Sequence, residues 1–120
     1  AIVSNGLVDQ ALVVGEGQSY LAALLVINGE SWPQIAQQLG LDPLQNDSLG
    51  SKVLQQHFVR LLRQWLFEFP AYARIRRVHL TLQPWTIEND LLTPTLKVKR
   101  ALVEQRYDKE IKALYQDTSS

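Results

Sequence analysis

Two apolar runs joined by a short glycine-containing turn constrain the fold of this chain more than any other feature. The first run lies within residues 7–15 and includes the letters ALVV, and the second, residues 20–28, reads YLAALLVIN. Apolar segments of this length on either side of the turn Gly15-Glu16-Gly17-Gln18 predict a buried β-hairpin. The turn joins strand to strand and lacks the glycine spacing of a phosphate-binding fingerprint, so we exclude it as a phosphate cradle.

Glycines mark the ends of two short helical segments. We expect residues 1–5 to be the end of a helix, which Gly6 terminates in the left-handed conformation that glycine tolerates best. Ser31 is a suitable N-cap residue for a short helix through Leu39, and Gly40 is expected to close that helix. The chain therefore turns from strand to helix directly after the hairpin.

The longest predicted helix follows a loop over residues 41–47. Asp47 or Ser48 is expected to cap this helix, and Pro70 is expected to end it. Its apolar residues recur at helical spacing and form one broad stripe: Val53, Leu54, His57, Phe58, Leu61, Leu62, Trp65 and Leu66. We interpret His57 as a histidine at the edge of the core, because few partners for catalysis surround it in the sequence.

A third strand and a final helix complete the predicted domain. Residues 74–83 alternate between apolar and polar types, which indicates a strand. Residues 99–116 predict a terminal helix, whose inward-facing set is Leu102, Val103, Tyr107, Ile111, Leu114 and Tyr115. Together these elements predict one α+β domain, with a small sheet of about three strands (the hairpin plus one later strand) packed with helices.

The charges are segregated along the chain although the net charge is zero. Residues 1–51 contain five acids and no Lys or Arg, whereas the remaining residues contain all twelve basic residues and seven acids. The basic residues form two short clusters, RIRR at 74–77 and KVKR at 97–100. This asymmetry predicts a contact with a polyanion, such as the phosphates of a nucleotide or of coenzyme A, or a nucleic acid. For the first cluster alone, a solvated basic surface is the preferred interpretation.

Composition excludes several kinds of site. The chain has no cysteine, which excludes disulfides, thiolate metal sites and a cysteine nucleophile, and fits a cytoplasmic location. Its two histidines are far apart, so we expect no metal site. No apolar run approaches the roughly 20 residues that span a bilayer, and residues 1–9 do not resemble a signal peptide. The chain also lacks methionine, so we expect it to be part of a longer protein.

Residues 84–100 form the most distinctive loop in the sequence. A polar stretch, Glu88-Asn89-Asp90, leads through two leucines to the bracket Thr93-Pro94-Thr95, after which Lys97 stands between two apolar residues. Threonines can bond their own backbone, and Pro94 fixes its own φ and biases Thr93 toward an extended conformation. We therefore expect a shaped loop that presents the Lys97 ammonium group at a fixed point.

The letters IENDLLTPTLKVKR in this loop resemble the C-terminal signature of long-chain fatty acid–CoA ligases, which belong to the adenylate-forming acyl-activating enzyme superfamily. Weaker similarity covers ALVVGEGQSYLAALLVIN and FPAYARIRRVHL. The resemblance implies that residues 1–120 are a mobile C-terminal lid domain of such an enzyme. The large N-terminal domain that binds ATP and the fatty acid, and the hinge between the two domains, would lie before residue 1.

The resemblance also implies the reaction and the site residues. The complete enzyme would use ATP with Mg²⁺ and coenzyme A to convert a fatty acid into its acyl-adenylate and then its thioester. Lys97 would be the catalytic lysine of the adenylation step, and Lys99 and Arg100 would be candidate contacts for phosphate or coenzyme A. Glu88, Asn89, Thr93, Pro94 and Thr95 would shape the loop, with no metal ligand among these residues. The isolated domain is expected to be inactive and to bind no cofactor by itself.

One departure and two alternatives accompany this resemblance. The family usually has glycine where this chain has Asp90, and aspartate tolerates a positive φ better than most residues but less well than glycine. A related enzyme that transfers the acyl group to a carrier protein is the first alternative. A basic polyanion-binding module is the second, although no aromatic residues interleave with the basic ones as nucleic-acid binding would favour. We expect no nucleic-acid partner and at most peripheral contact with a membrane, at its inner face.

Overall fold

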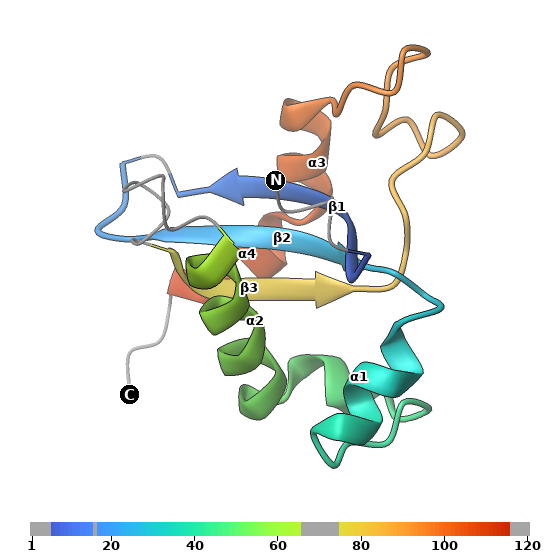
Figure 1. Ribbon diagram of the computed structural model, residues 1–120. Coiled ribbons are helices and arrows are strands. Elements are labelled where there is room, and N and C mark those ends of the chain that lie inside the picture. Colours follow the sequence, from blue (N-terminus) through green and yellow to red (C-terminus); the bar gives the residue numbers. More distant parts are fainter. Residues whose placement is uncertain (1–5, 16, 66–74, 116–120) are drawn as a thin grey trace.

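The computed structural model of this 120-residue chain describes residues 6–15, 17–65 and 75–115. Three strands form one sheet in the order β1-β2-β3, in which β1 and β2 are antiparallel and β2 and β3 are parallel. In chain order the elements are β1 (Val8–Val14), β2 (Leu21–Ile27), α1 (Trp32–Gln38), the 3-10 helix η2 (Asn46–Gly50), α2 (Lys52–Trp65), β3 (Ile75–Thr81), α3 (Arg100–Arg106) and α4 (Asp108–Tyr115). Figure 1 shows this arrangement, which confirms the predicted α+β domain with a three-stranded sheet.

The central strand β2 is buried on both faces of the sheet. Ala23, Leu25 and Ile27 belong to one hydrophobic cluster, and the alternating residues Ala22, Leu24 and Val26 belong to the other. Successive side chains of a strand point to opposite faces, so a strand covered on both sides reads as a continuous apolar run. This explains why the letters LAALLVI contain no polar residue.

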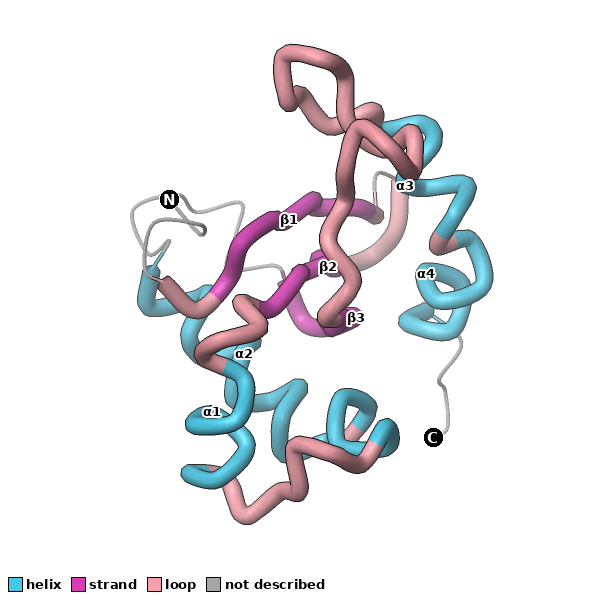
Figure 2. Tube along the Cα trace, turned by 90° about the vertical axis from the view of Figure 1, so that its right-hand side faces the viewer, coloured by secondary structure: helices cyan, strands magenta, loops and turns pink. Residues whose placement is uncertain are grey.

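Helices cover both faces of the sheet and make a three-layered domain. The first cluster packs α1 and α2 against the sheet through residues such as Ile35, Phe58 and Leu62. The second cluster packs α3, α4 and the loop before them through residues such as Val103 and Leu114. Figure 2 shows the sheet between these two groups of helices. No helix in the described part of the chain is long and apolar enough to cross a membrane.

The start of α1 is organised by a residue other than the predicted cap. Ser31 occupies the N-cap position, but its hydroxyl donates to the Gly6 carbonyl at 2.9 Å and makes no cap hydrogen bond. The carbonyl oxygen of the Asn28 side chain accepts hydrogen bonds from the backbone N–H groups of Glu30 and Ser31 instead. The prediction that Gly40 closes this helix is confirmed by its φ of +75°.

The start of α2 also differs from the prediction. Residues 46–50 form a 3-10 helix, and the Ser51 hydroxyl, rather than that of Ser48, accepts a hydrogen bond from a first-turn N–H, that of Leu54. The side chain of Asp47, the other predicted cap, lies outside the described residues. Val53, predicted in the apolar stripe, is 51% exposed. The side chain of Trp65 and the predicted helix end at Pro70 lie outside the described residues, as does the predicted helix over residues 1–5.

The predicted terminal helix is two helices joined at Tyr107. This residue has φ −103° and ψ 23°, which ends α3, although Ile111 N–H still donates to its carbonyl. The bend turns Tyr107 into the core, where it is 9% exposed, and leaves Leu102 at 36% exposure outside it. The inward assignment of Leu102 was therefore wrong.

Candidate functional site

The loop between β3 and α3 projects from one end of the sheet, as Figure 1 shows in orange. Gln10 of β1 holds the base of this loop by two hydrogen bonds: its Nε2 donates to the Trp85 carbonyl at 2.8 Å, and its Oε1 accepts from the Trp85 N–H at 2.7 Å. A register shift between Val8 and Gln10 accompanies this contact, which connects residues 75 positions apart in the sequence. The loop is thereby anchored to the first strand.

The Trp85 side chain anchors the same point inside the core. It is 2% exposed and packs in the cluster beneath α3 and α4. Its indole Nε1–H donates to the Tyr107 hydroxyl at 3.3 Å, and the two rings lie 6.4 Å apart. A buried tryptophan with its N–H satisfied combines a large apolar contact with a directional bond. The backbone and the side chain of Trp85 therefore both fix where the loop begins.

Asn89 organises the polar turn that follows. Its Oδ1 accepts from the Thr86 N–H at 2.9 Å, its Nδ2 donates to the Pro84 carbonyl at 3.1 Å, and its own N–H donates to Thr86 Oγ1 at 3.0 Å. Side-chain amides commonly form such turns by replacing backbone partners. The neighbouring Glu88 is exposed. The structure thus assigns the shaping of this turn to Asn89.

Residues 91–99, which we call the Lys97 hairpin, form a small two-stranded ribbon. Leu92 pairs with Val98 in antiparallel fashion, and the Lys99 N–H donates to the Leu91 carbonyl at 2.9 Å. Leu91 and Leu92 are 4% and 8% exposed, because they insert into the core cluster beneath α3 and α4. The base of the hairpin is therefore fixed in the domain, whereas Lys97 is exposed.

The tip of the hairpin is held by Thr93. Its N–H donates to the Lys97 carbonyl at 2.8 Å, and its Oγ1 accepts from the Lys97 N–H at 3.0 Å and pairs with Thr95 Oγ1 at 3.0 Å. The three-residue connection Pro94-Thr95-Leu96 is closed by a Leu96 N–H bond to the Thr93 carbonyl, and Leu96 has a φ of +65°. A left-handed residue at this position is the usual way to close a three-residue hairpin connection.

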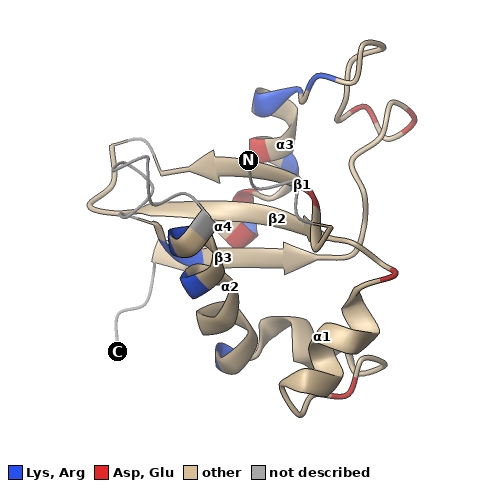
Figure 3. Ribbon diagram, viewed as in Figure 1, with Lys and Arg blue, Asp and Glu red and all other residues tan. Residues whose placement is uncertain are grey.

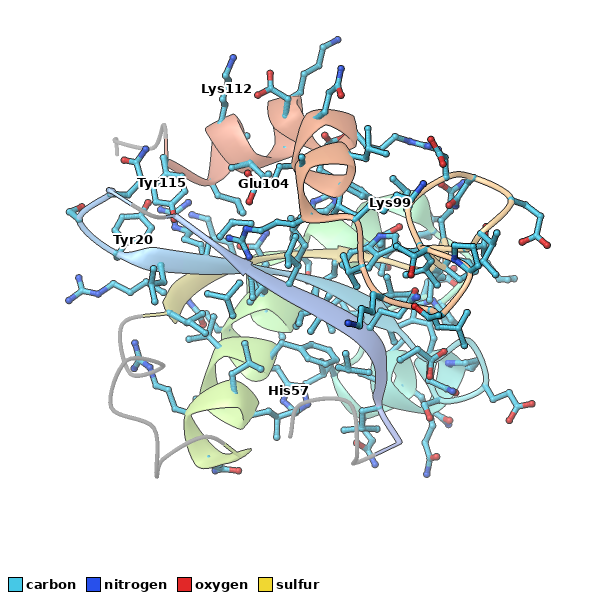
Figure 4. The ribbon with its side chains drawn as sticks, turned by 90° about the horizontal axis from the view of Figure 1, so that it is seen from above. Tyr20, His57, Lys99, Glu104, Lys112 and Tyr115 are labelled. Carbon is cyan, nitrogen blue, oxygen red and sulfur yellow. The ribbon has the colours of Figure 1, made fainter. Side chains whose placement is uncertain are left out.

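The three cations at the end of the hairpin differ in their partners. Lys99 Nζ lies 2.7 Å from Asp90 Oδ1, and Arg100 Nε lies 2.8 Å from Glu104 Oε2, while Arg100 also donates to the Val13 carbonyl. Among the described residues, no carboxylate lies within ion-pair distance of the Lys97 ammonium. Figure 3 shows this basic segment at the entrance to α3, and Figure 4 shows Lys99 on the hairpin side and Glu104 on the helix.

Asp90 has a φ of +68°, the conformation for which glycine would be the easiest residue. Its carboxylate also faces Lys99, the residue directly before α3, at a helix that has no acidic residue in its first turn. A negative charge near a helix N-terminus is favourable, whereas a cation there is not. Asp90 therefore compensates a cation that would otherwise stand unpaired at this helix end.

The histidines lie outside the hairpin. Burial, followed by the nearby Arg60 guanidinium, lowers the pKa of His57, whose ring lies edge-on to Phe58. Burial lowers the pKa of His79 and outweighs the raising effect of Glu110. Within residues 6–15, 17–65 and 75–115, no three His, Asp or Glu side chains are grouped so that they could hold a metal ion.

The sequence predicted a shaped loop around Lys97 but did not reveal two residues that determine its geometry, Gln10 and Leu96. Gln10 carried a weak signal, since it and Asp9 are the two polar residues of a strand segment that is otherwise apolar. The positive φ of Leu96 carried none, because leucine is not a residue that favours this conformation. Composition and spacing encode neither the distant partner of Gln10 nor the left-handed turn geometry of Leu96.

Known proteins resemble this chain over most of its length. The chain is 32% identical over 96% of its length to the long-chain-fatty-acid–[acyl-carrier-protein] ligase AEE15, chloroplastic, of Arabidopsis thaliana, and covers 14% of that protein. It is 28% identical over 89% of its length to long-chain-fatty-acid–CoA ligase 5 of Mus musculus, and covers 16% of it. The chain therefore spans about a sixth or less of the length of these relatives.

The fold also matches a solved adenylation domain. The A domain of carboxylic acid reductase from Segniliparus rugosus, in complex with AMP and a co-purified carboxylic acid, aligns with a TM-score of 0.69 and 27% identity. The alignment covers 91% of this chain and 16% of that one. The family model for the AMP-binding enzyme C-terminal domain matches residues 1–119. The chain therefore belongs to the C-terminal domain family of AMP-binding enzymes.

Proposed function

We infer that this domain is the lid of a long-chain fatty acid–CoA ligase and that Lys97 serves the adenylation step. The observation that carries the proposal is the placement of Lys97. It is exposed at the tip of a hydrogen-bonded hairpin, and its ammonium has no carboxylate partner among the described residues, whereas Lys99 and Arg100 both have one. A cation held in place and left uncompensated is suited to meet an anion outside its own domain.

The chemistry explains why a lysine is needed. A fatty carboxylate is a poor electrophile, and it becomes activated when its oxygen attacks the α-phosphorus of ATP, forming a P–O bond as pyrophosphate leaves. Negative charge gathers around that phosphorus, and a carboxylate must approach a polyanion. An ammonium group between the carboxylate and the phosphoryl oxygens lowers this repulsion and fixes the in-line approach. Lysine suits the role because its charge is compact and its stem is long.

The second half-reaction would use a different arrangement. The thiol of coenzyme A attacks the acyl carbon, the thiol proton is lost and AMP leaves; Lys97 takes no part once it is withdrawn from the site. Motion of the whole lid would withdraw the Lys97 hairpin, as lid motions do in enzymes that assemble and open their sites. No described residues of this domain form a ligand set for Mg²⁺.

The test is the substitution Lys97→Ala in the full-length enzyme. Acyl-adenylate formation, measured by ATP–pyrophosphate exchange, should be nearly abolished, whereas thioester formation from supplied acyl-adenylate should persist. Lys109→Ala is the matched control, since Lys109 is also exposed but lies on α4. Equal loss of both half-reactions in Lys97→Ala, or equal loss of adenylation in Lys109→Ala, would contradict the role proposed for Lys97.

The acyl acceptor has a second candidate. One relative is named for an acyl-carrier-protein acceptor, and a second solved structure, an A-PCP didomain of carboxylic acid reductase from Segniliparus rugosus, aligns with a TM-score of 0.70 and 26% identity. The full-length enzyme should be supplied with coenzyme A and, separately, with a carrier protein. The acceptor that releases AMP from the acyl-adenylate faster decides between the two.

A further inference from the structure

We propose that Leu96 is a positioning residue: its side chain packs on an apolar surface of the large N-terminal domain when the Lys97 hairpin enters the active site. This inference rests on the proposed function, because it concerns how Lys97 is held there. Within this domain, both the backbone conformation of Leu96 and the exposure of its side chain are unfavourable.

The first observation is the backbone of Leu96. Its φ of +65° lies in the left-handed region, where the Cβ of an ordinary L-residue crowds the following carbonyl oxygen. The hydrogen bonds from Leu96 N–H to the Thr93 carbonyl and from Thr93 N–H to the Lys97 carbonyl require this conformation to close the turn. Glycine would satisfy the same geometry without strain.

The second observation is the exposure of the Leu96 side chain. It is 66% exposed, whereas Leu91 and Leu92 at the base of the same hairpin are 4% and 8% exposed. A single exposed leucine carries no meaning by itself, as Leu44 shows, which is 91% exposed without a positive φ. Leu96 differs because the strain and the exposure coincide at one residue.

The two observations together indicate a partner. Glycine would adopt this backbone conformation without strain, and a polar side chain would be well solvated at this exposed position. Leucine has neither advantage. Burial of the Leu96 side chain against another domain would offset both the backbone strain and the exposure of apolar surface. Residues in strained backbone conformations are concentrated at functional sites. The occupant is an apolar surface on the rest of the same polypeptide, because the chain spans only 14–16% of its relatives.

The position in the sequence explains the effect on Lys97. Adjacent α-carbons are about 3.8 Å apart, so a surface that packs against Leu96 also restricts the position of the Lys97 α-carbon. Thr93 accepts a hydrogen bond from the Lys97 N–H and donates one to the Lys97 carbonyl. These bonds leave the backbone between Leu96 and Lys97 little freedom. Small displacements of a catalytic group cost large factors in rate, so an apolar contact here would act through Lys97.

The test uses the full-length enzyme and the variants Leu96→Gly, Leu96→Asn and Leu96→Met. Leu96→Gly relieves the backbone strain but removes the side chain, so hydrogen exchange of the hairpin amides should stay as slow as in the unaltered enzyme or become slower. The kcat of acyl-adenylate formation should nevertheless fall roughly ten- to a hundredfold. This factor corresponds to the free energy of burying one leucine side chain. Its KM for ATP should change less than its kcat.

Three further results complete the design. Leu96→Asn, which tolerates the left-handed conformation, should lose adenylation as Leu96→Gly does, and Leu96→Met should recover most of the rate because it keeps an apolar side chain. All three variants should form thioester normally from supplied acyl-adenylate. Leu44→Asn is the matched control for loss of an exposed leucine, and it should leave adenylation unchanged.

The inference is overturned if Leu96→Gly adenylates at the unaltered rate, if its hairpin amides exchange faster, or if Leu44→Asn loses activity equally. Lys97→Ala separates this failure from failure of the proposed function. If Lys97→Ala abolishes adenylation while Leu96→Gly does not affect it, only the role of Leu96 is wrong. If Lys97→Ala adenylates normally, both proposals are wrong.

Discussion

Asp90 and Lys99 face each other across the open end of the Lys97 hairpin, with 2.7 Å between Asp90 Oδ1 and Lys99 Nζ. The ion pair lies where the backbone bond from Lys99 N–H to the Leu91 carbonyl closes the ribbon. Asp90 stands where the sequence resemblance leads us to expect glycine. Its positive φ confirms the conformational demand of this position, and its carboxylate adds a contact that glycine could not make.

Removing the charge of Asp90 should weaken the hairpin slightly. Asp90→Asn keeps a residue that tolerates positive φ, so its effect should isolate the ion pair, which is exposed and worth about 0.2–1 kcal/mol of unfolding free energy. Chemical denaturation at low and high salt measures this, and the loss should shrink at high salt. In a double-mutant cycle with Lys99→Gln, strictly additive losses would show that the pair contributes nothing.

Gly15 should not tolerate a side chain. Its φ is +110°, and an added Cβ would fall on the Tyr115 hydroxyl and within 3.0 Å of the Tyr20 carbonyl oxygen, which that hydroxyl bonds at 2.9 Å. Gly15→Ala should therefore lower the free energy of unfolding by about 1–3 kcal/mol through overpacking, with backbone strain added. Figure 4 shows the stacked Tyr20 and Tyr115 rings that the change would disturb.

Gly29→Ala is the control for this change. Gly29 has no positive φ and no atom within 4 Å of an added Cβ, so its substitution should change the free energy of unfolding by less than about 0.5 kcal/mol. Equal destabilisation by the two variants in denaturant titrations would show that the Tyr115 contact is unimportant.

Asn89 should contribute more to loop order than its exposed neighbour. Asn89→Ala removes the acceptor of the Thr86 N–H and the donor to the Pro84 carbonyl, which should cost about 1–3 kcal/mol of unfolding free energy. Glu88→Ala should cost less than about 0.5 kcal/mol, since Glu88 is exposed. Hydrogen exchange at residues 86–92 should rise in the first variant and not in the second. The reverse order would contradict the assignment.

The domain should lose stability as the pH falls through the range in which histidine titrates. Burial lowers the pKa of His79 in the folded domain, so the unfolded chain, with a pKa near its ordinary 6.5, binds more protons. Stability is therefore full above about pH 6.5 and declines as the pH falls toward the lowered folded pKa. His57 shifts in the same direction.

The measurement is denaturant unfolding between pH 7.5 and about pH 5, compared with His79→Gln and His57→Gln. Each variant should show a shallower loss on acidification, because one of the two groups that favour the unfolded state at low pH is gone. A pH dependence identical to that of the unaltered domain in both variants would refute the assignment of this effect to the histidines.

The sheet could be predicted from the sequence because the two-sided burial of β2 leaves a continuous apolar run. The parallel pairing of β3 could not, since register and direction are set by packing between distant segments. The predicted N-cap position of Ser31 is confirmed, but its side chain makes no cap hydrogen bond, for a related reason. Asn28 accepts the N–H groups of Glu30 and Ser31 just before the helix, and the Ser31 hydroxyl is directed to the distant Gly6 carbonyl, a contact that local preference does not encode.

The candidate site, like the fold, could be predicted from the sequence only in part. The sequence predicted a shaped loop around Lys97, because residue types and spacing carry the turn chemistry of Thr93 and Asn89. It placed Leu102 in the core wrongly, because a helical pattern continued through Tyr107 assumes one straight axis, and the chain bends there. It also could not reveal Leu96, whose conformation violates the local preference of leucine.

The two bonds between Gln10 and Trp85 have a consequence for engineering. They bind the first strand to the root of the projecting loop, although 75 residues separate them in the chain. Shortened versions that begin after β1 would keep every residue of the Lys97 hairpin but lose the Gln10 contacts that anchor its loop, so a minimal transplantable unit must include β1.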